Sequence, residues 1–179
     1  MRLLKFKKEI SIFLLLGSLI SCDNTLDSPK FEIYEGPDNI TENINAVYTD
    51  SALIKAKVKA PIQEILRNGD NEYSKGMNIN FFDEQEELEN TLTCEYSIKN
   101  VKTGIWSIRG NVIINNIKKK EKLNTEELFW DASADRIWTK KFVRIETEDQ
   151  ILTGTGLESD QKFSEYEILK PSGFFEINE

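Results

Sequence analysis

The sequence predicts an all-β protein built from many short antiparallel strands, and three observations support this prediction. Apolar residues recur at every second position through most of the chain, as they do in strands with one buried face. Turn-forming residues separate these alternating runs at hairpin spacing. No window of a dozen residues carries an apolar stripe at helical spacing. The 179 residues, 39% of them hydrophobic, suffice for one domain with a real core.

The clearest strand runs over residues 52–60, where apolar residues alternate with three lysines. Similar alternation predicts further strands at residues 77–81, 92–98, 106–114, 143–147, 166–168 and 175–177. Turns are expected between them, at residues 67–70, 99–104, 116–122, 133–135, 148–150 and 171–173. The segment 84–90 has only Leu88 as an apolar residue, and we interpret it as a solvated hairpin end. Strands of this kind must close into a barrel, stack as two sheets or protect their edges.

A basic start followed by a short apolar stretch indicates a signal peptide at the N-terminus. Four basic residues precede the eleven residues 10–20. At a rise of about 1.5 Å per residue these cover roughly half of a ~30 Å hydrocarbon core, which is too short for a membrane span. Residues 19–22 (LISC) resemble a bacterial lipobox, whose cysteine becomes the first residue and carries acyl chains such as palmitate. We therefore predict a lipoprotein signal peptide at residues 1–21 and lipidation of Cys22; the alternatives are an ordinary secretory signal and an uncleaved anchor.

Cleavage before Cys22 would leave a lipidated tether, residues 22–33, and a β domain, residues 34–179. The tether is polar and rich in turn-forming residues. Residues 1–21 hold four of the 23 basic and one of the 31 acidic residues, so the chain from Cys22 onward has a net charge of −11. Anionic headgroups repel such a domain, and we expect acyl chains to hold it on the membrane. The same charge argues against nucleic acid as a partner.

The residue types also argue against an enzyme. The chain has no histidine, which excludes a Ser-His-Asp triad, a Cys-His pair and a His-ligated metal. The neighbouring acids Asp83 and Glu84, like Glu126 and Glu127, point to opposite faces of a strand and cannot flank one glycosidic bond. The sequence therefore predicts no catalytic residue, no metal and no cofactor.

Three further features are expected to be structural. Cys94 is interpreted as a buried small hydrophobic residue rather than a reactive thiol. Gly154 and Gly156 predict a bulge or a tight turn, since no third glycine or helix follows for a dinucleotide site. Lysines 118–120 predict a solvated hairpin tip, with contact to a lipid phosphate as the alternative.

Several motifs, taken in order, resemble the LptC family in the form seen in Bacteroidetes-type bacteria. LptC is the periplasmic component of the lipopolysaccharide export ABC transporter. The resemblance covers residues 34–174 and is carried by 34–38 (YEGPD), 48–52 (YTDSA), 75–77 (KGM), 81–84 (FFDE), 105–112 (IWSIRGNV), 123–131 (LNTEELFWD), 136–139 (RIWT) and 154–160 (GTGLESD).

The resemblance implies a twisted open β-jellyroll of stacked antiparallel strands, of the OstA-like type, with an apolar groove inside. It implies a non-enzymatic carrier that receives lipopolysaccharide from the inner-membrane ABC transporter complex and passes it to a periplasmic bridge of LptA-like jellyrolls. Better-known members have a transmembrane helix where this chain has Cys22. Asp23 resembles the signal that retains enterobacterial lipoproteins in the inner membrane, so a lipid-anchored position in the periplasm, on the inner membrane, is expected.

Residues on the alternating apolar face are the candidates for lining this groove, although each is equally compatible with an ordinary sealed core. They are Ile54, Ala56, Val58, Met77, Ile79, Phe81, Leu92, Tyr96, Trp106, Ile108, Val112, Ile114, Val143 and Ile145.

Handover to a partner requires strands with unpaired backbone groups at the ends of the sheet. The outgoing edge is predicted at residues 166–177, with Tyr166, Ile168, Phe175 and Ile177 facing the partner, and the incoming edge at residues 44–53. The C-terminal strand would alternatively fold back and close the sheet. The alternative function is a structural or glycan-binding β-sandwich lipoprotein of the cell envelope, which predicts a filled core and aromatic residues on an outer face.

Overall fold

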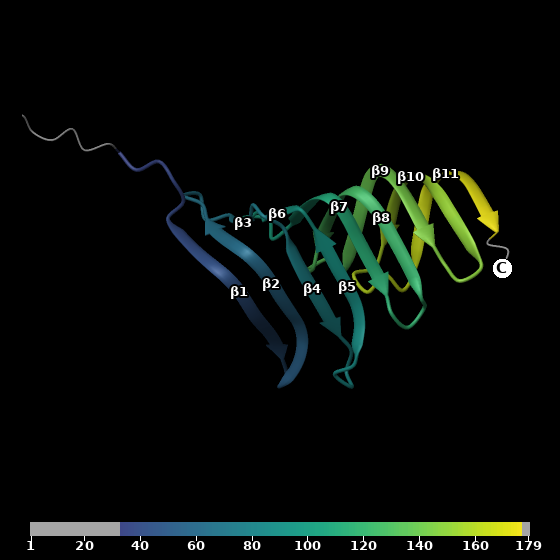
Figure 1. The fold of residues 1–179 in the computed structure, drawn as a ribbon, viewed down its shortest axis with the longest axis horizontal. Coiled ribbons are helices and arrows are strands. Elements are labelled where there is room, and N and C mark those ends of the chain that lie inside the picture. Colours follow the sequence, from purple (N-terminus) through teal and green to yellow (C-terminus); the bar gives the residue numbers. More distant parts are fainter. Residues whose placement is uncertain (1–32, 177–179) are drawn as a thin grey trace, which may run out of the picture. The chain divides into compact units, whose positions relative to one another are not determined.

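Eleven antiparallel strands form one sheet in the described part of the chain, residues 33–176 of a computed structural model (Figure 1). They are β1 (Asn39–Asp50), β2 (Leu53–Ile65), β3 (Asn71–Tyr73), β4 (Met77–Phe82), β5 (Leu88–Cys94), β6 (Tyr96–Lys99), β7 (Trp106–Asn116), β8 (Glu121–Asp131), β9 (Arg136–Glu146), β10 (Gln150–Ser159) and β11 (Tyr166–Glu176). Residues 33–176 contain no helix, so the predicted all-β class is confirmed. The predicted signal peptide, Cys22 and Ile177 lie outside the described residues, and side chains are described through Gly173.

The strands follow one another across the sheet in chain order. Two positions in the sheet are each occupied by two short strands. β3 and β4 share the position next to β2, and β5 and β6 share the position next to β7. The two positions are neighbours, because β3 pairs with β6 and β4 pairs with β5. From β7 to β11 each strand pairs with its successor. The sheet is therefore a meander with β1 at one edge and β11 at the other, as Figure 1 shows.

An irregular band crosses the middle of this sheet and bends its strands. Residues 74–76 separate β3 from β4, Glu95 separates β5 from β6, and the register shifts within β7, β8 and β10. Gly76 has a φ of 76°, and a Cβ there would lie 2.2 Å from the carbonyl oxygen of Cys94, so only glycine fits. Gly156 has a φ of 82° at the shift in β10, which confirms the bulge predicted there. Bulges of this kind bend a strand and increase its twist.

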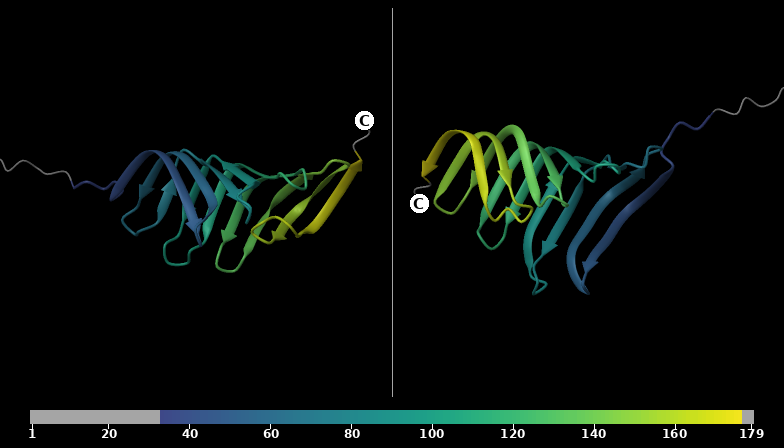
Figure 2. Two further views of the ribbon diagram at one scale, coloured as in Figure 1. Left: turned by 90° about the horizontal axis from the view of Figure 1, so that it is seen from below. Right: turned by 180° about the vertical axis from the view of Figure 1, so that it is seen from behind.

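The bend places two halves of the sheet face to face. We call one half arm A (residues 77–94, 112–125 and 143–154) and the other arm B (residues 71–73, 96–109, 128–139, 156–159 and 166–168). Phe81 of arm A and Trp130 of arm B come from opposite ends of the strands, yet their ring centroids are 5.7 Å apart. The contact is edge to face, as aromatic pairs prefer. The inner faces of the arms therefore pack on one another, and Figure 2 shows the curvature that allows this.

The structure differs from the expected strands where bulges interrupt the alternation. β8 and β10 have no clean period of two, because their register shifts move the apolar positions by one residue. β2 begins at Leu53, and Ala52 lies in the preceding turn with a φ of 64°. The segment read as a hairpin end is a turn only up to Glu87, since β5 begins at Leu88.

Candidate functional site: an apolar trough

A row of apolar residues begins in β2 and continues across the inner face of arm A to β10. Each member pairs across the ladder with the next: Val58, Ile79, Leu92, Ile114, Leu123, Ile145 and Leu152. β1 adds Ala46 opposite Val58, so the row begins at the edge of the sheet. We call the space between this row and the facing side chains of arm B the trough.

The centre of the trough is filled. Ile108 and Leu128 of arm B and Leu123 and Val143 of arm A have no exposed surface. These residues belong to one continuous core cluster, packed as the interior of any globular domain is. For the central positions the structure therefore shows the sealed core that the sequence left as the alternative.

The inner face is less buried at the end formed by β1 and β2. Tyr48 pairs with Ala56 and keeps 63% of its surface exposed. Ala56, Val58 and Phe81 are half-buried and pack against the core cluster. We call these four residues the β1–β2 mouth.

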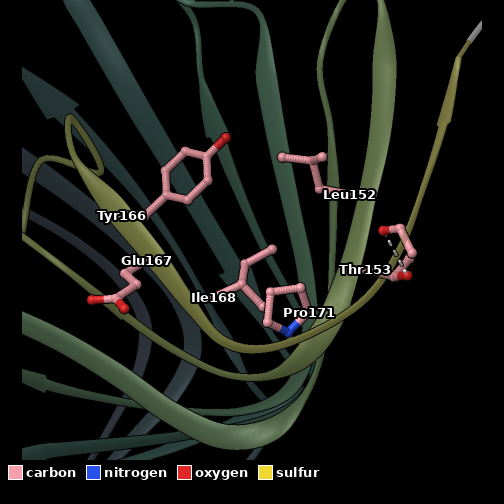
Figure 3. Close-up of a pocket in the computed structure, with 7 residues that line it drawn as sticks. Leu152, Thr153, Tyr166, Glu167, Ile168 and Pro171 are labelled. Carbon is pink, nitrogen blue, oxygen red and sulfur yellow. Dashed lines mark hydrogen bonds between the residues drawn. The ribbon is translucent and has the colours of Figure 1, made fainter.

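A pocket lies at the other end, between β10 and β11. It is a cavity of about 460 Å³ lined by Leu152, Thr153, Tyr166, Glu167, Ile168, Pro171 and Gly173. In Figure 3 Leu152, Tyr166 and Ile168 point towards one another, whereas Glu167 points away. Leu152 is the last member of the row that crosses arm A, so this cavity continues the trough. We call it the β10–β11 pocket.

All but one of the residues predicted to line a groove lie on the inner face. Eight of them are buried: Met77, Ile79, Leu92, Ile108, Val112, Ile114, Val143 and Ile145. Five are half-buried: Ile54, Ala56, Val58, Phe81 and Trp106.

Tyr96 is the exception, and its placement in the groove is wrong. Glu95 belongs to neither β5 nor β6, and this single extra residue reverses the alternation, so that Ser97 rather than Tyr96 is buried inside. Tyr96 lies opposite Arg109, and its hydroxyl donates to Glu72 Oε1 at 2.7 Å. Burial of the ring, with the Glu72 carboxylate beside it, raises the pKa of Tyr96 to about 12.

An aromatic cluster in the trough was missed by the sequence analysis. Tyr73 stacks on Trp106 with ring centroids 5.9 Å apart, and Trp106 stacks on Trp130 at 6.0 Å. Trp130 follows the register shift in β8, and Tyr73 belongs to a strand of three residues, so neither shows in an alternating pattern. The Trp130 Nε1–H group is buried and has no partner among the described residues.

The two terminal strands are both edges of the described sheet. β1 pairs with β2 alone and β11 with β10 alone, so the sheet is open and β11 does not close it against β1. The expected incoming edge at residues 44–53 needs correction, because β1 spans Asn39–Asp50 and Leu53 already belongs to β2. Phe175 lies in β11 opposite Ile151.

The outer face carries a separate hollow beside an aromatic pair. Ile98, Ser107, Phe129 and Trp138 are successive neighbours across four strands, and a cavity of about 560 Å³ lies over them. The rings of Phe129 and Trp138 stack with centroids 5.5 Å apart. The buried Ser107 hydroxyl lacks a partner among the residues that the structure describes.

The lysines at the β7–β8 turn have protein partners. Lys118 Nζ lies 2.5 Å from Asp83 Oδ2, Lys120 pairs with Glu148, and Lys119 donates to the Ser164 carbonyl oxygen. The hydrogen bond from Lys118 holds the pKa of Asp83 below its ordinary value. These contacts favour the hairpin tip over a lipid-phosphate site.

Cys94 is half-buried on the inner face beside Met77. Burial raises the pKa of its thiol, because the thiolate would lose solvation. This agrees with the interpretation of Cys94 as a packing residue.

Comparison with known proteins identifies the family. The described residues contain neither a cluster of acidic and cysteine side chains suited to a metal ion nor a helix of the length and apolarity that a membrane span requires. A search of curated proteins found no match. The model of the family described as "Lipopolysaccharide-assembly, LptC-related" matches residues 11–171. This match covers nearly the whole chain and confirms the resemblance to the LptC family. The chain therefore belongs to the LptC family of the cell envelope, whose members are transport components with a role in lipopolysaccharide transport.

Proposed function

We propose that this protein is a non-enzymatic lipid carrier that receives lipopolysaccharide from an inner-membrane ABC transporter complex and passes it to an LptA-like periplasmic bridge. The single observation that carries the proposal is the apolar row on arm A. It runs from Ala46 at one edge to Leu152 beside the other, with half-buried residues at the first end and a cavity at the second. A path of this kind leads a lipid across the sheet rather than into a closed pocket.

An acyl chain needs an apolar path because its exposure to water is costly. Each methylene group exposed to water costs ~0.8 kcal/mol, so an acyl chain crosses the periplasm only if protein replaces its lipid surroundings. The half-buried residues of the β1–β2 mouth provide the first apolar contacts. Because the centre is filled, acyl chains must then part the two arms, and the side chains now packed on each other would pack on the lipid instead.

Partners dock on the edge strands in this proposal. β1 and β11 each present backbone N–H and C=O groups on the side that faces away from the sheet. A partner strand added there by β-augmentation would continue the sheet and align its own trough with this one. β11, with Tyr166, Ile168, Phe175 and Ile177, is the proposed outgoing edge, and β1 is the incoming edge.

The anchor completes the proposal. Cleavage after residue 21 and acylation of Cys22 would hold the tether, residues 22–33, at the inner membrane. Two or three acyl chains are ample for stable anchoring, even for a domain of this negative charge.

Site-specific photocrosslinking of lipopolysaccharide tests the proposal. A photoreactive residue replaces Ile79 or Ile108 in membranes that contain the transporter, with Asn78 and Arg109 as matched positions on the outer face. ATP-dependent crosslinks at the inner positions alone are expected. Their absence at every inner position of a folded, lipidated protein would contradict the carrier function.

Two observations favour a second candidate, a structural or glycan-binding lipoprotein of the envelope. The centre of the trough is filled, and Phe129 and Trp138 form an aromatic pair beside a hollow on the outer face. Saccharide binding that is lost in Trp138→Ala, combined with no lipid crosslink, would favour this candidate over the carrier.

A further inference from the structure

The loop between β10 and β11, residues 160–165, bridges the two arms. It begins where β10 ends in arm B, yet its backbone carbonyls accept hydrogen bonds from arm A and from the β7–β8 turn. Asn90 Nδ2 donates to the Lys162 carbonyl at 2.9 Å, Asn116 Nδ2 donates to the Phe163 carbonyl at 3.4 Å, and Lys119 Nζ donates to the Ser164 carbonyl. We call residues 160–165 the strap.

Phe163 fills the space beneath the strap. Its side chain is only 1% exposed, belongs to the core cluster, and stacks on Tyr166 with ring centroids 4.9 Å apart. Tyr166 also lines the β10–β11 pocket. Phe163 therefore connects the core cluster to Tyr166, a residue that lines the pocket at the outgoing end.

Internal hydrogen bonds hold the strap in its conformation. The Asp160 side chain accepts hydrogen bonds from the backbone N–H groups of Ser164 at 2.6 Å and Glu165 at 3.1 Å, and the Phe163 N–H donates to the Asp160 carbonyl. The three bonds to Asn90, Asn116 and Lys119 are separate from this turn and from the strand ladder. Breaking them frees the strap from arm A while every strand pair stays intact.

Phe163 also has a strained backbone. Its φ of 52° is in the left-handed region, which is unfavourable for a residue with a side chain. Burial of the ring and the three hydrogen bonds of the strap hold this conformation. Release of the strap would relieve the strain and take away the ring that blocks the path.

We propose that the strap is a latch on the outgoing end of the trough, with Phe163 occupying the position of an acyl chain until lipid displaces it. This inference rests on the proposed carrier function. It accounts for a trough that is filled at its centre and has half-buried residues at one end and a cavity at the other. It also predicts two separable steps: lipid enters at the β1–β2 mouth with the strap closed, and reaches the β10–β11 pocket only after the strap opens.

Locking the strap tests the order of these steps. Asn90→Cys and Lys162→Cys are joined by oxidation in a Cys94→Ala background, and photoreactive residues at Val58 and Leu152 report lipopolysaccharide at the two ends of the trough. Oxidation should remove the crosslink at Leu152, keep that at Val58, and lose its effect after reduction. The single variant Asn90→Cys is the control for the substitution itself.

Releasing the strap gives the converse result. Asn116→Ala with Lys119→Ala removes two of its hydrogen bonds and leaves Phe163 unchanged. The crosslinking yield at Leu152 should rise by about tenfold, as expected when two hydrogen bonds that hold the strap closed are lost. Asn115→Ala is the matched control, because Asn115 lies in the same strand and bonds to Thr91 instead.

The outcomes separate this latch from the carrier function. A locked chain that still crosslinks at Leu152, or a released chain that behaves like Asn115→Ala, would overturn the latch while crosslinking at Val58 keeps the carrier. A wild-type chain that crosslinks at neither position would overturn both.

Discussion

Val58→Arg is expected to abolish lipid loading in a protein that still folds. Val58 is half-buried at the β1–β2 mouth, between Ala46 and Ile79 in the apolar row. Complete burial of a valine side chain contributes ~1.5–3 kcal/mol, so the loss at this position is ~1 kcal/mol. An arginine at the mouth can extend its guanidinium into water. The cost is small beside the ~5–15 kcal/mol by which domains are stable.

The effect on lipid is larger than the effect on folding. The guanidinium keeps its hydration and holds water at the entrance of the trough. An acyl chain with about four methylene groups in contact with that water loses ~3 kcal/mol, which lowers occupancy roughly a hundredfold. Val58→Ala removes the same packing without adding charge and should lose little loading.

A position deeper in the same row gives the contrast. Ile114 is only 4% exposed, and an arginine there would bury its charge at a cost of several kcal/mol in addition to the lost packing. Ile114→Arg should therefore unfold the domain, whereas Val58→Arg should not. Circular dichroism melts measure folding, and a photocrosslink to lipopolysaccharide at Ile79 measures loading. A folded Val58→Arg protein that loads like wild type would refute Val58 as part of the lipid path.

Four further predictions follow from single contacts. Gly76→Ala should lower stability by ~2 kcal/mol or more and Tm by about 4 °C or more, because its Cβ meets the Cys94 carbonyl; an unchanged melt would contradict the left-handed turn. Tyr96→Phe should cost ~1 kcal/mol in urea unfolding and leave lipid crosslinking unaltered; a loss of crosslinking would return Tyr96 to the groove. The hydrogen bond from Lys118 holds the pKa of Asp83 below its ordinary 3.8. The ionised Asp83 therefore stabilises the folded wild type above pH 3.8, and this contribution is lost as the pH falls through the lowered pKa. Asp83→Asn should accordingly be less stable than wild type at pH 6 and converge with it at about pH 2, and parallel pH profiles would argue against the ion pair. Cys94 should react with a thiol reagent at pH 8 far more slowly in the native than in the unfolded chain, because burial raises its pKa; equal rates would show an accessible thiol.

The regular strands could be predicted, because alternation of apolar and polar residues directly indicates that one face of a strand is buried. Residues 106–114 show it well: Ile108, Val112 and Ile114 are buried. The pattern survives the bulge at Gly110 and Asn111, because Ile108 and Val112 are four residues apart in β7 and both lie on the inner face. The two edge strands could also be inferred, since the first and last strands of a meander have one neighbour each.

The missed features share one physical cause, which is the irregular band. A single residue between β5 and β6, Glu95, reversed the face of Tyr96 and Ile98, and nothing in the local sequence sets it apart from a strand residue. The shift in β8 hid Leu128 and Trp130 in the same way. Phe163 escaped notice because it lies in a loop of polar residues, and its burial depends on Asn90 and Asn116, more than 40 positions away in the chain. Such long-range contacts leave no periodic signal.

The meander also determines how the sheet can be extended. From β7 to β11 each strand pairs with its immediate successor, so this part of the sheet is a linear array of hairpins. Such an array can be extended by adding strands one after another at its end. Insertion or loss of one hairpin would lengthen or shorten the array by about 10 Å, twice the spacing of neighbouring strands, without repacking the rest. The reach of the molecule is thus a quantity that evolution can adjust in steps.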